Sequence, residues 1–76
     1  MSHDEIREDL IAHDDEFRRL FEDHRQSEQR LAQIHQKSLL SQDDEVEEKR
    51  IKLHKLALKD RMELMVRQRS VERVHA

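Results

Sequence analysis

Six histidines are the residues of this sequence that most directly suggest chemistry. His13, His24 and His35 recur every eleven residues, which places them on one side of a helix. Eleven residues make three turns and about 16 Å of rise, so no two of these rings can bind the same metal ion. The sequence has neither His-Glu-x-x-His nor the paired Glu-x-x-His of helical metal sites. His24 with Glu28, one turn on, is only half of a site that a second chain would have to complete, and we predict no metal site.

The simpler interpretation of His24 is a polar residue in the contact between two helices, opposite Leu58. There it would reach a carboxylate or a backbone carbonyl of a neighbouring helix. If the ring is buried and neutral, acidification should weaken the folded state, because burial disfavours the charged imidazole.

The other candidates for catalysis lack partners. Asp60 has no evident nucleophile, general base or pocket, and we interpret Asp60 and Lys59 as structural residues. The serines do not lie in a nucleophile-elbow motif. Because the chain contains no cysteine and no glycine, it has no disulfide, thiolate ligand or glycine-rich phosphate loop. The sequence therefore predicts no catalytic residue and no cofactor, and a protein that is not an enzyme.

Composition limits the elements that could position functional groups. The 76 residues are 43% charged and 34% hydrophobic, with a mean hydropathy of -1.11, which leaves little material for a core. The first residues are acidic where a signal peptide is basic, and no apolar run exceeds three residues. We therefore expect one cytoplasmic domain over residues 1–76, with no membrane partner.

Hydrophobic periodicity predicts helices throughout the chain. Apolar residues from Ile6 to Ile34 fall on one side of a helical projection, and no proline or glycine interrupts the pattern. We expect one break near Asp14 and another before an N-cap at Asp43 or Asp44. The predicted fold is all-α, with a short helix over about 3–12, a long helix over 15–37, a loop over 38–43 and a long helix over 44–70.

A connection of this length makes the two long helices antiparallel neighbours. Folding the chain about residue 41 places Phe17 opposite Met65 and Leu31 opposite Ile51. The predicted hairpin core comprises Phe17, Leu20, Phe21, His24, Leu31, Ile51, Leu58, Met62 and Met65.

The second long helix carries a further apolar stripe on its opposite side. A hairpin covers only one stripe, and an exposed apolar strip of this length is unusual in a monomer. Each large side chain fully buried in a second copy would contribute roughly 1.5 to 3 kcal/mol. We therefore expect a homodimer or higher oligomer, most simply a four-helix bundle of two hairpins; the alternative is a thin hairpin whose stripe stays partly in water. The predicted oligomer interface comprises Val46, Leu53, Ala57 and Leu64.

Charge is divided unequally along the chain. Residues 1–48 contain 6 Lys and Arg against 15 Asp and Glu, whereas residues 49–69 contain 8 against 2. This division favours antiparallel pairing of an acidic helix with a basic one. It also permits an alternative, in which a basic ridge of Lys52, Lys55 and Lys59 contacts the phosphates of a nucleic acid. The overall net charge of -3 and the scarcity of aromatic side chains argue against that alternative.

Two blocks of sequence resemble a known family. They are Phe17-Arg18-Arg19-Leu20-Phe21-Glu22-Asp23-His24 and Lys55-Leu56-Ala57-Leu58-Lys59-Asp60. Together they resemble the YdcH-like family of small bacterial proteins of unknown function, over roughly residues 14–66. The resemblance implies a bacterial, cytoplasmic helical hairpin and supplies no activity. The chain departs from the family pattern at Asp15, where proline is common, and at Arg61, where an acid is usual.

The sequence thus predicts a non-enzymatic, self-associating helical module that interacts with itself and with another protein. The alternative is the nucleic-acid-associated protein described above. Binding that falls steeply with salt and requires the three lysines would select the alternative. Association that is insensitive to salt and is lost on Leu53→Asp or Leu64→Asp would select the module.

Overall fold

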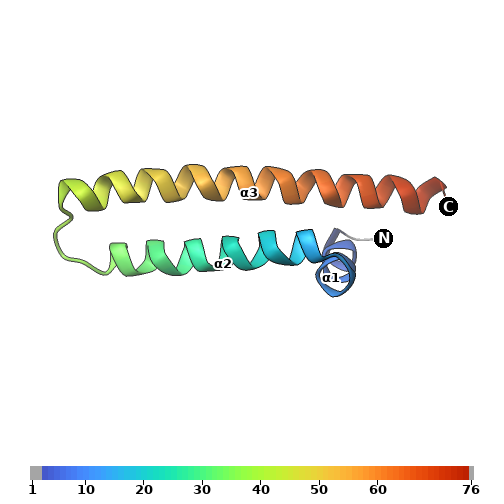
Figure 1. Ribbon diagram of the computed structural model, residues 1–76, viewed down its shortest axis with the longest axis horizontal. Helices are drawn as coiled ribbons and strands as arrows, with labels where there is room; N and C mark the ends of the chain where they lie inside the picture. The colour runs from blue at the N-terminus through green and yellow to red at the C-terminus, as the bar shows by residue number, and fades with distance from the viewer. Residues whose placement is uncertain (1–2, 76) are drawn as a thin grey trace.

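The computed structural model describes residues 3–75 and the side chains of residues 4–72. Figure 1 shows two long helices side by side and antiparallel, with a short helix at the open end of the hairpin. The helices are α1 (His3–His13), α2 (Asp15–His35) and α3 (Gln42–His75). The molecule measures 53 × 20 × 17 Å along its principal axes. The predicted all-α fold is confirmed over the described residues; residues 1–2 and 76 of the predicted domain lie outside them.

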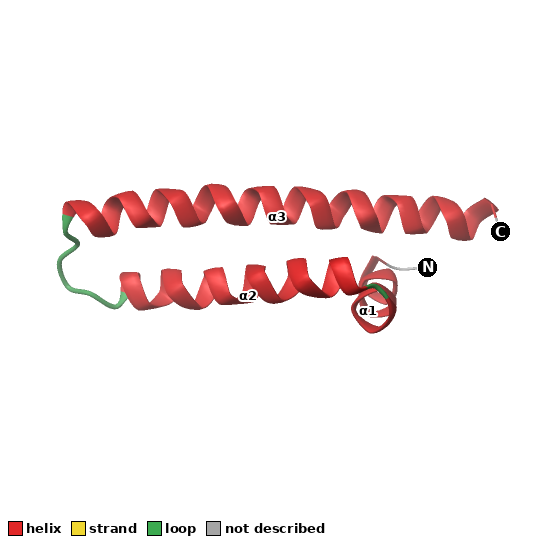
Figure 2. Cartoon of the chain, viewed as in Figure 1, coloured by secondary structure: helices red, strands yellow, loops and turns green. Residues whose placement is uncertain are grey.

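A single residue, Asp14, separates α1 from α2 (Figure 2). Its backbone is extended, with φ -120° and ψ 114°, and its carboxylate accepts a hydrogen bond from the Phe17 amide at 2.9 Å. Asp14 is therefore the N-cap of α2, which allows a break without proline or glycine. The Arg18 side chain donates hydrogen bonds to the carbonyls of Ile11 (3.0 Å) and Ala12 (3.3 Å). These carbonyls lie in the last turn of α1, where the helix itself offers no amide partner. α1 consequently turns across the hairpin, and Figure 1 shows it almost end-on.

The connection between α2 and α3 ends in a reciprocal capping box. The Ser41 hydroxyl accepts a hydrogen bond from the Asp44 amide (3.1 Å), and the Asp44 carboxylate accepts one from the Ser41 amide (3.0 Å). Ser41 is thus the cap, rather than Asp43 or Asp44 as the sequence predicted. α3 begins two residues earlier than expected, at Gln42, and continues five residues beyond the expected end.

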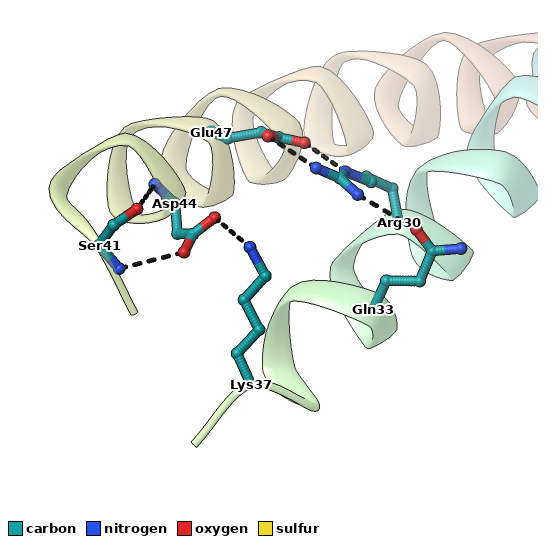
Figure 3. A network of polar contacts seen from close by, with 6 residues as sticks. All are labelled: Arg30, Gln33, Lys37, Ser41, Asp44 and Glu47. Atoms are coloured by element: carbon teal, nitrogen blue, oxygen red, sulfur yellow. Dashed lines mark hydrogen bonds and ion pairs between the residues drawn. The ribbon is translucent and has the colours of Figure 1, made fainter. Parts of the chain in front are cut away.

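A network of charged side chains joins the two long helices beside this connection (Figure 3). Lys37 donates to Asp44 at 2.8 Å, and Arg30 binds Glu47 through both carboxylate oxygens while also donating to Gln33 at 3.2 Å. Lys37, followed by the Ser41 amide and hydroxyl, lowers the pKa of Asp44 to about 2 from an ordinary value of 3.8. Arg30 likewise lowers the pKa of Glu47.

We predict acid sensitivity from Asp44. A carboxyl whose pKa is lower in the folded than in the unfolded chain stabilises the fold above its unfolded pKa, and this contribution is lost as the pH falls through the folded pKa. For Asp44 the free energy of unfolding should therefore fall between about pH 4 and about pH 2. Urea unfolding across this range should show a shallower fall in Asp44→Asn, which should already be less stable at neutral pH.

The matched control is Glu45→Gln in the same turn of α3. Within the described part of the chain, the Glu45 side chain makes no hydrogen bond or ion pair, so its removal should leave the acid profile nearly unchanged. An Asp44→Asn profile parallel to wild type would contradict the assignment.

The core lies where all three helices meet. Ile6 (1% exposed) and Leu10 of α1 pack with Phe17 (2% exposed) of α2 and with Met65 and Val66 of α3. Ile11, Leu20 and Met62 are partly buried and pack against this cluster. Further along the hairpin, the buried residues are Ser27, Leu31, Ile34, Asp44 and Leu58.

The predicted hairpin core is found in part. Phe17 and Met65, expected to lie opposite one another, belong to the same cluster. Phe21 differs: it is 42% exposed and lies at the edge of the core, because α2 directs the Phe17 side of the helix towards α3. The other predicted core residues divide into two groups: Phe17, Leu31, Leu58 and Met65 are buried, whereas Leu20, His24, Ile51 and Met62 are half-buried.

Candidate interaction surface

The two faces of α3 differ in how their charges are satisfied. On the inner face, charged side chains pair with α1, α2 or the connection. These pairs are Asp9 with Arg69, Glu16 with Arg61, Asp23 with His54, Glu28 with Lys55, Arg30 with Glu47, His35 with Glu48, and Lys37 with Asp44. Exposed pairs of this kind contribute little each, but together they fix the antiparallel alignment of the hairpin.

The outer face of α3 carries an apolar strip that nothing in the described part of the chain covers. We call it the outer stripe, and it comprises Val46, Leu53, Leu56, Ala57, Leu64 and Val71. Leu53 is 69% exposed and Leu64 is 42% exposed, whereas Leu58 and Met65 on the inner face are buried. The stripe includes all four predicted interface residues, and the structure places them together on one side of one helix.

Six charged residues lie on or beside the outer stripe: Asp43, Lys49, Arg50, Asp60, Glu63 and Arg67. Within residues 4–72, none of these six side chains forms a hydrogen bond or an ion pair. This differs from the inner face, where the charged side chains named above have partners in the same chain.

A shallow apolar groove of about 270 Å³ lies beside the three-helix junction. It is lined by Arg7, Ile11, Phe17, Phe21, His24, Glu28, Lys59 and Met62. The groove explains the partial exposure of Phe21. The ionisable groups at its rim include no nucleophile placed beside a base, so the groove shows no arrangement for covalent catalysis.

His24 occupies a different environment from the one predicted. Its Nδ1 lies 3.1 Å from Glu28 Oε1, a carboxylate of its own helix, and its side chain is 24% exposed. The acid is in turn 3.8 Å from Lys55 of α3. The His24 ring is thus half-buried and faces a carboxylate of its own helix, whereas the sequence placed it in the contact between the two long helices.

The predicted lysine ridge lies along one flank of α3, but carboxylates neutralise part of it. Lys52 donates to Glu48 at 3.0 Å, and Lys55 lies 3.8 Å from Glu28. Lys52 and then His35 lower the pKa of Glu48, which therefore stays ionised beside them. Lys59 is exposed. The ridge thus presents less positive charge than its sequence indicates.

Two properties of the described residues bear on chemistry. No cluster of three or more His, Cys, Asp or Glu side chains there has an arrangement suited to a metal ion. No described helix combines the length and apolar character needed to cross a bilayer.

A hairpin of two long helices, closed at one end by a charged network and at the other by a crossing helix, defines a small protein that is all-helical over residues 3–75. Residues 17–66 match the model of a family described as "Protein of unknown function (DUF465)". The match spans more than half of the chain, so the protein belongs to this family of small proteins, in agreement with the resemblance to the YdcH-like family. No curated protein and no solved structure matches the chain.

Proposed function

We propose that this protein is a non-enzymatic helical interaction module of the bacterial cytoplasm that acts as a homodimer. The observation that carries the proposal is the outer stripe, a row of exposed apolar side chains on the face of α3 opposite the hairpin core. Isolated exposed leucines are normal on protein surfaces, but apolar side chains that recur along one helix face are typical of an interface. Burying it would contribute roughly 25 cal/mol for each Å² of apolar surface removed from water.

The distribution of apolar residues supports contact through α3 alone. On α2 the exposed large apolar side chain is Phe21, which belongs to the groove rather than to a stripe. A square four-helix bundle needs an apolar face on both long helices of each hairpin. We therefore propose a flat assembly, in which the two α3 helices pair in the middle and one α2 helix lies on each outer side.

The alternative function, nucleic-acid binding through Lys52, Lys55 and Lys59, receives less support. Two of these lysines lie beside carboxylates of the same chain, so a phosphate would have to displace those contacts. The groove supports an enzymatic role no better, because its polar groups are not arranged for proton transfer or nucleophilic attack.

Sedimentation equilibrium tests the proposal. We expect wild type to have twice the 9.3 kDa chain mass, and both Leu53→Asp and Leu64→Asp to sediment as helical monomers, because each places charges inside the shared apolar contact. Ala32→Asp is the matched control, since it introduces the same charge at an exposed apolar site on α2 and should leave the dimer intact. A wild-type monomer at high concentration, or a dimer that tolerates both stripe substitutions, would refute the proposal.

A further inference from the structure

We propose that two copies of the chain pair their α3 helices antiparallel, about a two-fold axis level with residue 55. This inference rests on the proposed homodimer and adds its orientation and register. The occupant of the outer stripe is thus the same stripe of a second chain, turned end for end. The spacing of the exposed residues and the six charged residues on or beside the outer stripe, unpaired within residues 4–72, support this pairing.

The outer stripe follows a heptad repeat. Leu53 and Val46 are seven residues apart, as are Ala57, Leu64 and Val71. Positions 43, 50, 60 and 67 complete the two series, and with them consecutive positions alternate at spacings of three and four. This spacing brings one face of a helix repeatedly against a partner helix. The repeat is interrupted by charge at Arg50 and Asp60, positions where a purely apolar contact would have leucine or valine.

In an antiparallel pair centred on residue 55, residues whose numbers add to 110 lie opposite each other. Val46 then faces Leu64, and Leu53 faces Ala57, so exposed apolar side chains meet one another across the interface. Leu56, which is 55% exposed, lies next to the two-fold axis and approaches its own copy. Each layer occurs twice, because the arrangement is symmetric.

The same register pairs the charges. Arg50 faces Asp60 in the middle of the contact. Asp43 faces Arg67 in the stripe. Lys49 and Glu63, whose numbers add to 112, are two residues from direct opposition and approach each other along the flank of the stripe. The six charged side chains named above, on or beside the outer stripe, therefore form three complementary pairs, each present twice in the dimer.

Other arrangements lose this complementarity. A shift by one heptad in one direction places Asp43 against Asp60, and a shift in the other direction places Arg50 against Arg67. A parallel pair brings each residue close to its own copy, so Asp60 meets Asp60 and Arg50 meets Arg50. Like charges opposed in an interface disfavour that pairing, which makes Arg50 and Asp60 the residues that select the register.

A charge-exchange experiment tests the central pair. Arg50→Asp and Asp60→Arg each create two like-charge contacts in the homodimer, and each should raise its dissociation constant by about tenfold or more. Mixing the two variants restores both opposite-charge contacts in a heterodimer, so the mixture should associate about as tightly as wild type. Lys59→Asp, which changes the net charge as Arg50→Asp does but lies off the stripe, should not gain affinity for the Asp60→Arg chain. Equal affinities for both mixtures would overturn the register.

Cysteine cross-linking tests orientation, and the native chain has no cysteine to interfere. Val46→Cys and Leu64→Cys chains should form a disulfide-linked dimer when mixed. Neither should cross-link alone, because like positions would lie about 27 Å apart along the axis. Cross-linking of each variant with itself would show a parallel dimer, and no cross-link in the mixture would show another register; both overturn this inference but leave the homodimer. Monomeric wild type would instead overturn the proposed function.

Discussion

Replacing Phe17 by alanine should remove about 3 to 5 kcal/mol from the free energy of unfolding. The Phe17 side chain is 2% exposed and contacts the cluster that holds all three helices together, so truncation leaves a cavity that no single helix can close. A chain of this size has a total stability of only about 4 to 11 kcal/mol. Urea unfolding followed by circular dichroism, at one fixed chain concentration, measures the loss.

Phe21→Ala is the matched comparison for this prediction. It removes the same ring four residues later, from a position that is 42% exposed at the edge of the groove. Because less apolar surface leaves water at this site, the loss of stability should be clearly smaller. Equal losses for the two variants would mean that Phe21 is covered in solution and that the groove has an occupant.

The contrast between these two phenylalanines shows what periodicity could and could not predict. Both belong to the apolar side of α2, and the sequence placed both in the core. The difference depends on how α2 rotates about its axis, which is set by the packing of Ile6 and Leu10 against Phe17. A helical projection has no information on the position of α1, so it could not separate them. The same contact explains Val66, which is buried although it lay outside the predicted core.

The sequence predicts that α2 and α3 each begin after a capping residue, but it does not always identify which residue is the cap. The break at Asp14 follows from one carboxylate able to accept the Phe17 amide, and the sequence located it correctly. At the start of α3 several residues could act as the N-cap. The choice depends on whether the side chain three residues later can accept a hydrogen bond from the backbone amide of the cap. Ser41 is the cap because Asp44, three residues later, can bind its amide in return.

The candidate interface was predicted in its apolar part, since the second stripe follows from spacing alone. Its charged part needed coordinates. Arg50 and Asp60 are ordinary charged residues in a sequence that is 43% charged. They become informative only when the inner charges, such as Arg61 and Lys55, are seen to pair within the chain and these two are not. The heptad spacing of 46, 53 and 60 was the available signal.

α3 presents two different faces. Its inner face packs with α1 and α2, and its outer face carries the apolar stripe that we propose pairs with a second chain. A side chain substituted on one face does not touch the other face, because the body of α3, about 10 Å in diameter, lies between them. Substitutions on the inner face should therefore change the stability of the fold, and substitutions on the outer face should change association.

Ile6→Asp should detach and melt α1 while the proposed dimer survives. Ile6 is 1% exposed, so a carboxylate at this position would be buried without a partner. Such burial is unfavourable in free energy, and the chain avoids it when α1 leaves the core. α1 has 11 residues, and isolated helices of that length are marginal in water, so an undocked α1 should unfold. Circular dichroism should lose the helical signal of these residues, and amide exchange there should become fast.

The matched control is Arg7→Asp, which places the same carboxylate one residue later on an exposed position of α1. It should keep α1 folded, because the side chain at that position remains in water. In Ile6→Asp the contact of Arg69 with Asp9 should be lost with the helix, and the unfolding transition should move to lower urea. Sedimentation should still give a dimer, since the outer stripe lies on the other face of α3. A monomeric Ile6→Asp with α2 and α3 intact would show instead that α1 forms part of the interface.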